Sequence, residues 1–205
     1  MADTVRVALD KHSYDIIIGE QLLAKAGELI APHLAAPRVV IISDNQVARF
    51  WLHRLSNALE AAKIQYRSIV IPAGEQSKSF GQFAELLENI LAQAPDRKTT
   101  ILALGGGVVG DLAGFAASVL LRGVPYIQIP TSLLAQVDSS VGGKTAINSQ
   151  YGKNLIGSFH QPSLVLTDVA TLGTLPAREL KAGYAEMLKY GLIGDAAFFA
   201  WLEQN

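Results

Sequence analysis

A glycine cluster carries the clearest chemical signal in the sequence. Gly105, Gly107 and Gly110 fit the spacing G-x-G-x-x-G between a strand-like run and a helix-like run. Such a turn lets the backbone approach a pyrophosphate closely, and the following helix presents unpaired N–H groups to the negative charge. The cluster predicts a dinucleotide site, with a purely structural turn as the alternative. The acid that usually binds the ribose about twenty residues further on is missing, which argues against an ordinary dinucleotide-dependent dehydrogenase.

A second glycine-rich stretch, DSSVGGKT at 138–145, imitates the end of a P-loop. A P-loop needs glycine where Asp138 stands, and a carboxylate there would repel the phosphates, so an NTPase is disfavoured. Lys144, together with Lys153 and Asn154, supplies polar groups that suit a phosphorylated polyol. A solvated polar loop is the alternative interpretation.

Two further acids, Asp44 and Glu75, stand between a predicted strand and a predicted helix, Glu75 within GEQSK at 74–78. In open parallel sheets ligands bind beyond the carboxyl ends of the strands, which makes Asp44 and the adjacent Asn45 ligand candidates. The same position suits the cap of a helix. For Glu75 and Ser77 capping is the favoured interpretation, and for Asp44 the two remain open.

Glu186 and Lys189 are three residues apart on a predicted helix and therefore share a face, with Glu179 two turns earlier. An ion pair on the surface explains the spacing as well as a functional pair does.

The composition limits the classes of function. The 205 residues are half apolar and carry a formal net charge of −1, with 17 basic and 18 acidic residues. A globular core is expected, and nucleic acid is an unsuitable partner because no basic run could follow a phosphate backbone. The lack of cysteine excludes disulfides and thiolate metal ligands and fits the cytoplasm. No secretory signal is recognised, and Asp111 and the glycines argue against a membrane span at 101–121.

Strand-like and helix-like runs alternate along the chain, which predicts an α/β fold with a Rossmann-like, mostly parallel sheet and helices on both faces. The predicted strands are 5–9, 15–18, 38–43, 66–71, 99–104, 126–129 and 164–167. The predicted helices are 21–34, 46–62, 79–93 and 112–121.

Two segments depart from this alternation. Residues 137–157 show no period and predict a functional loop or a linker. After Pro176 the pattern is helical, so we expect an α/β domain at 1–175 and the beginning of a helical domain at 176–205. The apolar segment 198–202 has nothing after it to cover it, which predicts that the helical domain is truncated.

Taken together, the motifs resemble the 3-dehydroquinate synthase family of sugar-phosphate cyclases over nearly the whole chain. The matching segments are GEQSK at 74–78, GGGVVGDLAGFAA at 105–117, RGV at 122–124, PTSLLAQVDSSVGGKTAIN at 130–148, GKNLIGSFHQP at 152–162 and TLPAREL…YAEMLKYG at 174–191. The family converts 3-deoxy-arabino-heptulosonate 7-phosphate to 3-dehydroquinate and phosphate by transient oxidation with bound NAD, phosphate elimination, re-reduction, ring opening and aldol closure.

The resemblance implies specific residue roles. NAD would contact Asp44, Gly74, Glu75, Lys78, Gly106, Gly107, Val108, Val109, Gly110, Asp111, Thr131, Ser132, Lys144, Lys153, Thr171, Leu172, Gly173 and Thr174. The catalytic and substrate residues would be Asp138, Lys144, Asn154, Lys189 and Arg122. Lysine and arginine suit phosphate because they form charge-assisted hydrogen bonds. Arg122 would reach the neighbouring subunit of a homodimer.

The same resemblance makes Glu186 a ligand of a divalent metal, zinc or cobalt, whose two histidine ligands lie further along in the family. The four histidines of this chain, at 12, 33, 53 and 160, all precede the helical segment. A catalytic zinc generally has three protein ligands, so we expect an incomplete metal site and little or no turnover by these residues alone.

Three departures from the family pattern are present. Ser132 stands where many members have threonine and keeps the hydroxyl, whereas Ala73 and Gly173 each replace a charged residue. The competing interpretations are an NAD-binding module without chemistry, a related sugar-phosphate cyclase and a polyol dehydrogenase. Lys144 discriminates against the last, because a dehydrogenase has no need of a phosphate-binding lysine there.

Overall fold

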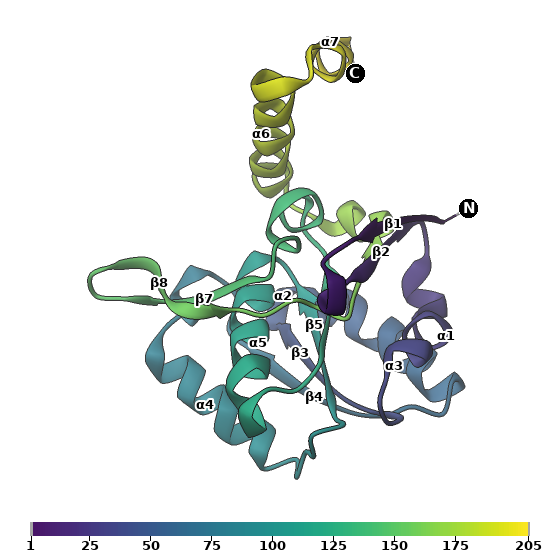
Figure 1. The fold of residues 1–205 in the computed structure, drawn as a ribbon, viewed down its shortest axis with the longest axis vertical. Coiled ribbons are helices and arrows are strands. Elements are labelled where there is room, and N and C mark those ends of the chain that lie inside the picture. Colours follow the sequence, from purple (N-terminus) through teal and green to yellow (C-terminus); the bar gives the residue numbers. More distant parts are fainter. Residues whose placement is uncertain (1, 205) are drawn as a thin grey trace.

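The computed structural model describes residues 2–204, in which a seven-stranded sheet forms the centre of the molecule (Figure 1). The strands are β1 (Asp3–Val7), β2 (Tyr14–Gly19), β3 (Arg38–Asp44), β4 (Gln65–Ile71), β5 (Thr100–Gly105), β6 (Tyr126–Pro130) and β9 (Leu164–Asp168). Their order is β1-β2-β9-β6-β5-β3-β4, and every neighbouring pair is parallel except β1–β2. The predicted α/β class with a mostly parallel sheet is confirmed.

The central strands are buried on both faces, which explains their continuous apolar sequences. In β3, Val39 and Ile41 pack into the core on one face, and Val40 and Ile42 pack into the core on the other. All residues of β5, β6 and β9 are buried, whereas the edge strand β1 is largely exposed.

Helices cover both faces of the sheet (Figure 1). One face packs against α1 (Ala26–Ile30) and α3 (His53–Ala61), and the other against α4 (Phe80–Leu91) and α5 (Gly107–Val119). The prediction of a helix at 46–62 is confirmed, although α2 (Asn45–Val47) and α3 are joined by a π-helical turn at Ala48–Leu52. Helix α5 begins earlier than predicted, because the glycine cluster itself forms its first turn.

The predicted single helix at 21–34 is wrong. The segment consists of a 3-10 turn at Leu22–Lys25, the short helix α1 and a second 3-10 turn at Ala31–His33. Pro32 lacks a backbone N–H and clashes with a preceding helical turn, so α1 cannot continue through it.

The segment at 137–157 is not wholly irregular, which corrects the expectation of a loop or linker without periodic structure. It contains β7 (Lys144–Ser149), which pairs antiparallel with β8 (Gly152–Phe159) to form a hairpin beside α5 (Figure 1). Thr145 and Ile147 are buried in alternation, and a Cβ on Gly114 of α5 would lie 2.5 Å from Thr145 Cγ2. The strand period is present but short, and the surrounding glycines conceal it.

Two helices follow the α/β part of the chain. Helix α6 (Ala177–Gly194) extends away from the sheet, and α7 (Ala196–Gln204) packs across its end (Figure 1). Within residues 2–204 no helix is both long and apolar enough to cross a membrane, and the apolar stretch at 101–121 folds mainly into β5 and α5.

Candidate functional site

The strand order reverses between β3 and β5. The chain passes from β3 outward to β4 and then returns to the other side of β3, where β5 and β6 follow. Ligands of open α/β sheets bind beyond the carboxyl ends of the strands at such a reversal. Asp44 ends β3 and Gly105 ends β5, with Ser43 opposite Leu104 in the parallel register. The topology therefore brings Asp44 and the glycine cluster to one place.

The glycine cluster forms a close-fitting turn at the start of α5. A Cβ on Gly105 would lie 2.5 Å from Val109 Cγ2, one on Gly106 would lie 3.2 Å from Ser132 Oγ, and one on Gly107 would lie 3.0 Å from Ser139 Oγ. The Ser139 hydroxyl is itself buried without a hydrogen-bond partner. The first turn of α5 thus presents backbone N–H groups beside a buried hydroxyl, an arrangement that suits an anion.

The remaining members of the cluster lie within α5. A Cβ on Gly110 would lie 2.8 Å from Gln128 Oε1, so a larger residue there would displace the Gln128 amide. Val109 is buried in the core, whereas Val108 is half-buried. Because the Val109 side chain is buried, Val109 could face a ligand only with its backbone atoms.

Thr131 and Ser132 follow β6 directly beside the glycine turn. The Thr131 N–H donates to the Gly105 carbonyl at 3.0 Å, and Thr131 is buried. Ser132 Oγ accepts a hydrogen bond from the Ala135 N–H at 3.3 Å. Both residues therefore lie where the resemblance places cofactor contacts.

Lys78 connects three segments at this edge of the sheet. Its side chain is only 4% exposed, and its Nζ donates to Asp111 Oδ2 at 2.5 Å and to Asn154 Oδ1. Asp111 belongs to the first turns of α5, and Asn154 belongs to β8. Burial raises the pKa of the Asp111 carboxyl, and the adjacent Lys78 ammonium opposes this rise without cancelling it.

The expectation that Glu75 or Ser77 caps a helix is wrong. Helix α4 is capped by Ser79, whose Oγ accepts from the Gln82 N–H at 3.3 Å. Ser77 Oγ donates to the Pro72 carbonyl instead, and Gly74 has a φ of 106° that favours glycine.

Glu75 faces the hairpin. Its Oε1 accepts from Asn148 Nδ2 at 2.8 Å and lies 3.7 Å from Lys153 Nζ, whose side chain is largely exposed. Lys144 begins β7 and is also exposed. Glu75, Lys78, Asp111, Lys153 and Asn154 are therefore brought together from segments far apart in the sequence.

Asp44 does cap α2. Its Oδ1 accepts from the Gln46 N–H at 2.8 Å and from the Val47 N–H at 2.9 Å, and the residue is nearly buried. The cap uses one carboxylate oxygen in these bonds.

The segment 171–174 lies in a 3-10 helix, Val169–Thr174, after the carboxyl end of β9. Thr171 Oγ1 donates to the Asp168 carbonyl at 2.7 Å, and Thr174 Oγ1 accepts from Trp51 Nε1 at 2.9 Å. Leu172 is half-buried, and a Cβ on Gly173 would meet no atom within 4 Å. This turn lies at the same edge as the glycine cluster, two strands away from β5.

Asp138 contacts helix α6 through Tyr190. The Tyr190 hydroxyl donates to Asp138 Oδ1 at 3.1 Å, and desolvation together with this carboxylate raises the pKa of Tyr190. Glu186 and Lys189 form the ion pair that their spacing allows. Within residues 2–204 no group of three or more histidine, cysteine, aspartate or glutamate side chains could hold a metal ion.

Arg122 is not brought to the other candidates. It ends a 3-10 turn, Leu120–Arg122, that follows α5 at the end opposite the glycine cluster, and it is exposed with a φ of 68°. Its role in a neighbouring subunit stays a prediction.

Sequence reasoning missed Asn148 and Tyr190. Each contacts a predicted site residue through long-range bonds, Asn148 with Glu75 and Tyr190 with Asp138. No local spacing indicated these partners, because each pair is separated by more than fifty residues.

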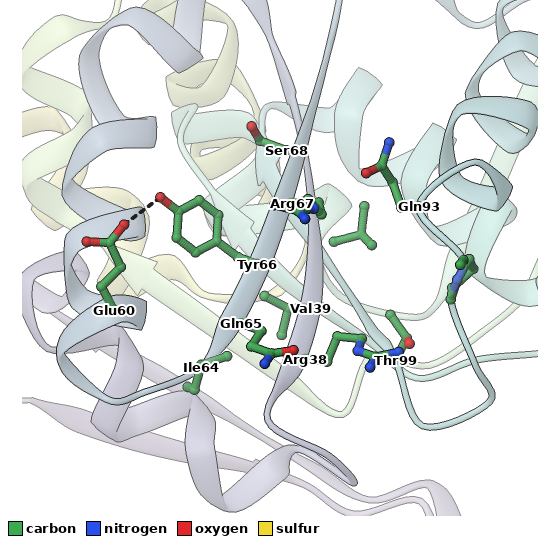
Figure 2. Close-up of a pocket in the computed structure, with 13 residues that line it drawn as sticks. Arg38, Val39, Glu60, Ile64, Gln65, Tyr66, Arg67, Ser68, Gln93 and Thr99 are labelled. Atoms are coloured by element: carbon green, nitrogen blue, oxygen red, sulfur yellow. Dashed lines mark hydrogen bonds between the residues drawn. The ribbon is translucent and has the colours of Figure 1, made fainter.

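A cavity of about 850 Å³ lies at the opposite, amino edge of the sheet (Figure 2). Its lining includes Arg38, Gln65, Arg67 and Gln93, and beside it the Tyr66 hydroxyl donates to Glu60 Oε1 at 2.7 Å. None of the predicted site residues lines this cavity. Chemical groups, rather than volume, therefore identify the candidate site at the carboxyl edge.

Comparisons with known proteins identify the family of this chain. Residues 68–182 match the family model described as 3-dehydroquinate synthase N-terminal. The 3-dehydroquinate synthase of Rhodospirillum rubrum is 59% identical over 100% of this chain and 53% of its own length. The chain thus spans about half the length of the curated relatives it matches.

Solved structures of other synthases are also similar to this chain. The 2-epi-5-epi-valiolone synthase of Streptomyces hygroscopicus subsp. jinggangensis 5008, with NAD+ and Zn2+ bound, is 37% identical over 97% of this chain and 54% of its own, with a TM-score of 0.87. A 2-deoxy-scyllo-inosose synthase with carbaglucose-6-phosphate, NAD+ and Co2+ is 31% identical over 93% of this chain and 52% of its own, with a TM-score of 0.85. Alcohol and glycerol dehydrogenases at 14–20% identity share the fold alone.

Proposed function

This chain belongs to the 3-dehydroquinate synthase family, and on that premise we propose that it forms the NAD-binding part of an NAD- and divalent-metal-dependent carbon–oxygen lyase. The enzyme converts 3-deoxy-arabino-heptulosonate 7-phosphate to 3-dehydroquinate and phosphate. The observation that carries the proposal is the contact of Lys78 with both Asp111 and Asn154, which joins the glycine turn to the hairpin at the strand-order reversal. The relatives named above that are more than 30% identical are all synthases, so the polyol dehydrogenase alternative is not favoured.

The residues at the carboxyl edge fit NAD. Gly106 and Gly107 leave room that a Cβ would fill, and the start of α5 supplies N–H donors for the pyrophosphate. Asp44, Glu75 and the turn at 171–174 would contact the remainder of the cofactor. NAD would supply a reversible hydride acceptor for the substrate hydroxyl. The residues of this chain would bind and orient it.

The hairpin and its neighbours would hold the substrate. Lys144 and Lys153 are exposed ammonium groups that can stabilise the charge of a phosphate as it leaves. Asn154 would orient a hydroxyl through its amide, and Asp138, fixed by Tyr190, would accept a hydrogen bond. Lys189 Nζ lies 5.2 Å from the centre of the Tyr190 ring and would face the same region.

Within the described residues only Glu186 would contribute a ligand to the metal. Glu186 is paired with Lys189, and residues 2–204 contain no set of three suitable side chains. A bound zinc or cobalt ion would lower the pKa of the hydroxyl that is oxidised. We derive no step through it from these residues.

We also propose two features of the assembly. The boundary between the α/β domain and the helical domain lies at 175–176, immediately before α6 begins at Ala177. The enzyme would act as a homodimer in which Arg122 reaches the phosphate site of the neighbouring subunit. Its exposure at the far end of α5 fits a role outside its own chain.

The test measures phosphate release from the heptulosonate phosphate with NAD and zinc present. It compares this 205-residue chain with a protein in which the chain continues through the length of its relatives, and NAD binding is titrated on both. We expect both to bind NAD and only the longer protein to release phosphate. Accumulation of NADH without phosphate release would favour a dehydrogenase. NAD binding with neither product, even by the longer protein, would favour a binding module.

A further inference from the structure

Asn148 makes three hydrogen bonds that join the β7–β8 hairpin to the loop 74–78. Its backbone N–H donates to the Lys78 carbonyl at 2.7 Å, and its Nδ2 donates to Glu75 Oε1 at 2.8 Å. Its Oδ1 accepts from the Asn154 N–H at 2.9 Å. One half-buried amide therefore contacts both the loop and the hairpin.

These bonds close a ring of three residues. Asn148 bonds to Lys78, Lys78 bonds through its Nζ to Asn154, and Asn154 bonds back to Asn148. Asn154 has a φ of 57°, in the left-handed region that is unfavourable for most side chains. The bond from its N–H to Asn148 Oδ1 stabilises this conformation and thereby directs its side chain to Lys78.

The ring is separate from the pairing that holds the hairpin together. The register of β7 and β8 shifts between Ile147 and Ser149, which leaves the Asn148 N–H free to bond with Lys78. An irregularity of this kind re-aims a residue out of the sheet ladder. The hairpin also has independent support, because Thr145 and Ile147 are buried beside α5.

Only an amide meets the needs of this position. Nδ2 must donate to a carboxylate while Oδ1 accepts from a backbone N–H, and an amide offers both functions. An ionised carboxylate of the same shape would lose the donor and place a like charge against Glu75. Alanine would lose both bonds.

We propose that Asn148 is a positioning residue for the reaction assigned above, on which this inference rests. It fixes Glu75 and Lys78, which contact the cofactor, relative to Asn154, which contacts the substrate. Asn148 would act through these residues and need not touch either ligand.

The test titrates NAD into this chain, its Asn148→Asp variant and its Asn89→Asp variant, at about pH 7 and at about pH 5. Asn89 is exposed on α4, so Asn89→Asp adds the same charge away from the ring. We expect Asn148→Asp to weaken NAD binding by about tenfold or more near pH 7, since a bond to a charged group is lost. Asn89→Asp should leave the affinity unchanged.

Near pH 5 the loss should shrink. Two adjacent carboxyls share a proton, which raises the pKa of the pair, and a protonated carboxyl can again donate as the amide did. The other charged groups around the pair are Lys153, Lys78 and Asp111.

The results of these titrations separate failure of the inference about Asn148 from failure of the proposed function. Equal NAD affinity of the wild-type chain and Asn148→Asp would overturn the inference and leave the proposed function standing. A loss that lower pH does not reduce, or that accompanies loss of the far-ultraviolet circular dichroism of the fold, would also overturn it. Failure of the wild-type chain to bind NAD would overturn the proposed function, and the inference with it.

Discussion

At the carboxyl edge of the sheet Lys78 keeps 4% of its side chain exposed and bonds to a carboxylate, whereas at the amino edge Arg38 and Asp96 keep 47% and 57% exposed and lie 3.7 Å apart. The amino edge has the cavity of about 850 Å³, yet its charges remain in water. Removing a charge from water is unfavourable unless the charge is paired and bonded. The desolvated pair therefore distinguishes the functional edge better than the cavity does.

The largest expected effect comes from removing the buried cation. Lys78→Met would leave the Asp111 carboxylate buried without its partner, and we expect the free energy of unfolding to fall by about 3 kcal/mol. Lys98→Met, in the exposed turn before β5, is the matched control at the amino edge. Urea unfolding measures both. If the two variants lost equal stability, the contrast between the edges would be wrong.

A smaller effect is expected from filling the glycine turn. Gly106→Ala would place a Cβ 3.2 Å from Ser132 Oγ, where the cofactor pyrophosphate would approach, and we expect NAD affinity to fall by about tenfold. Calorimetric titration measures this change. Gly81→Ala in α4 is the control, because its Cβ meets nothing within 4 Å. It should leave NAD binding unchanged and stabilise the helix by about 0.5–1 kcal/mol.

The smallest effect is a difference in pH dependence between the edges. Burial raises the pKa of Asp111 above its ordinary value of 3.8, so its contribution to stability is complete below that pH and is lost as the pH rises through the folded pKa. The Lys98 N–H lowers the pKa of Asp96, so its contribution is present above 3.8 and is lost as the pH falls through the folded pKa.

Urea unfolding between about pH 3 and pH 7 compares the wild type with Asp111→Asn and Asp96→Asn. The stability of the wild type relative to the variant should fall with rising pH for Asp111 and rise for Asp96. Slopes of the same sign would show that the pKa of Asp111 is lowered in the folded protein, so that Lys78 outweighs burial.

Features that depend on the succession of neighbouring residues could be predicted from the sequence. Gly105 follows a buried strand and precedes a helix, so the turn and its place at the carboxyl edge were predictable. The hairpin was not, because only Thr145 and Ile147 show the strand period between glycines. The cap of α4 was misassigned because several polar residues in 75–79 could bond to the helix start, and only Ser79 does.

The contacts of Lys78 could not be predicted from its neighbouring residues. Its partners Asp111 and Asn154 are 33 and 76 residues away, and nothing in their neighbouring residues specifies the pairing. Family resemblance named all three as ligand contacts but not as contacts of one another. Tyr190 and Asn148 were missed for the same reason.

Lys78 and Asn154 are 76 residues apart in the sequence, and this separation affects the order of folding. Contacts between distant residues form slowly, because a long loop must close before the contact stabilises it. During synthesis Lys78 and Asp111 leave the ribosome well before Asn154, so the ring cannot close until the hairpin has emerged. We therefore expect the sheet to assemble before the edge at which we propose the cofactor site, and the amide hydrogens of loop 74–78 to be among the last to gain protection from exchange.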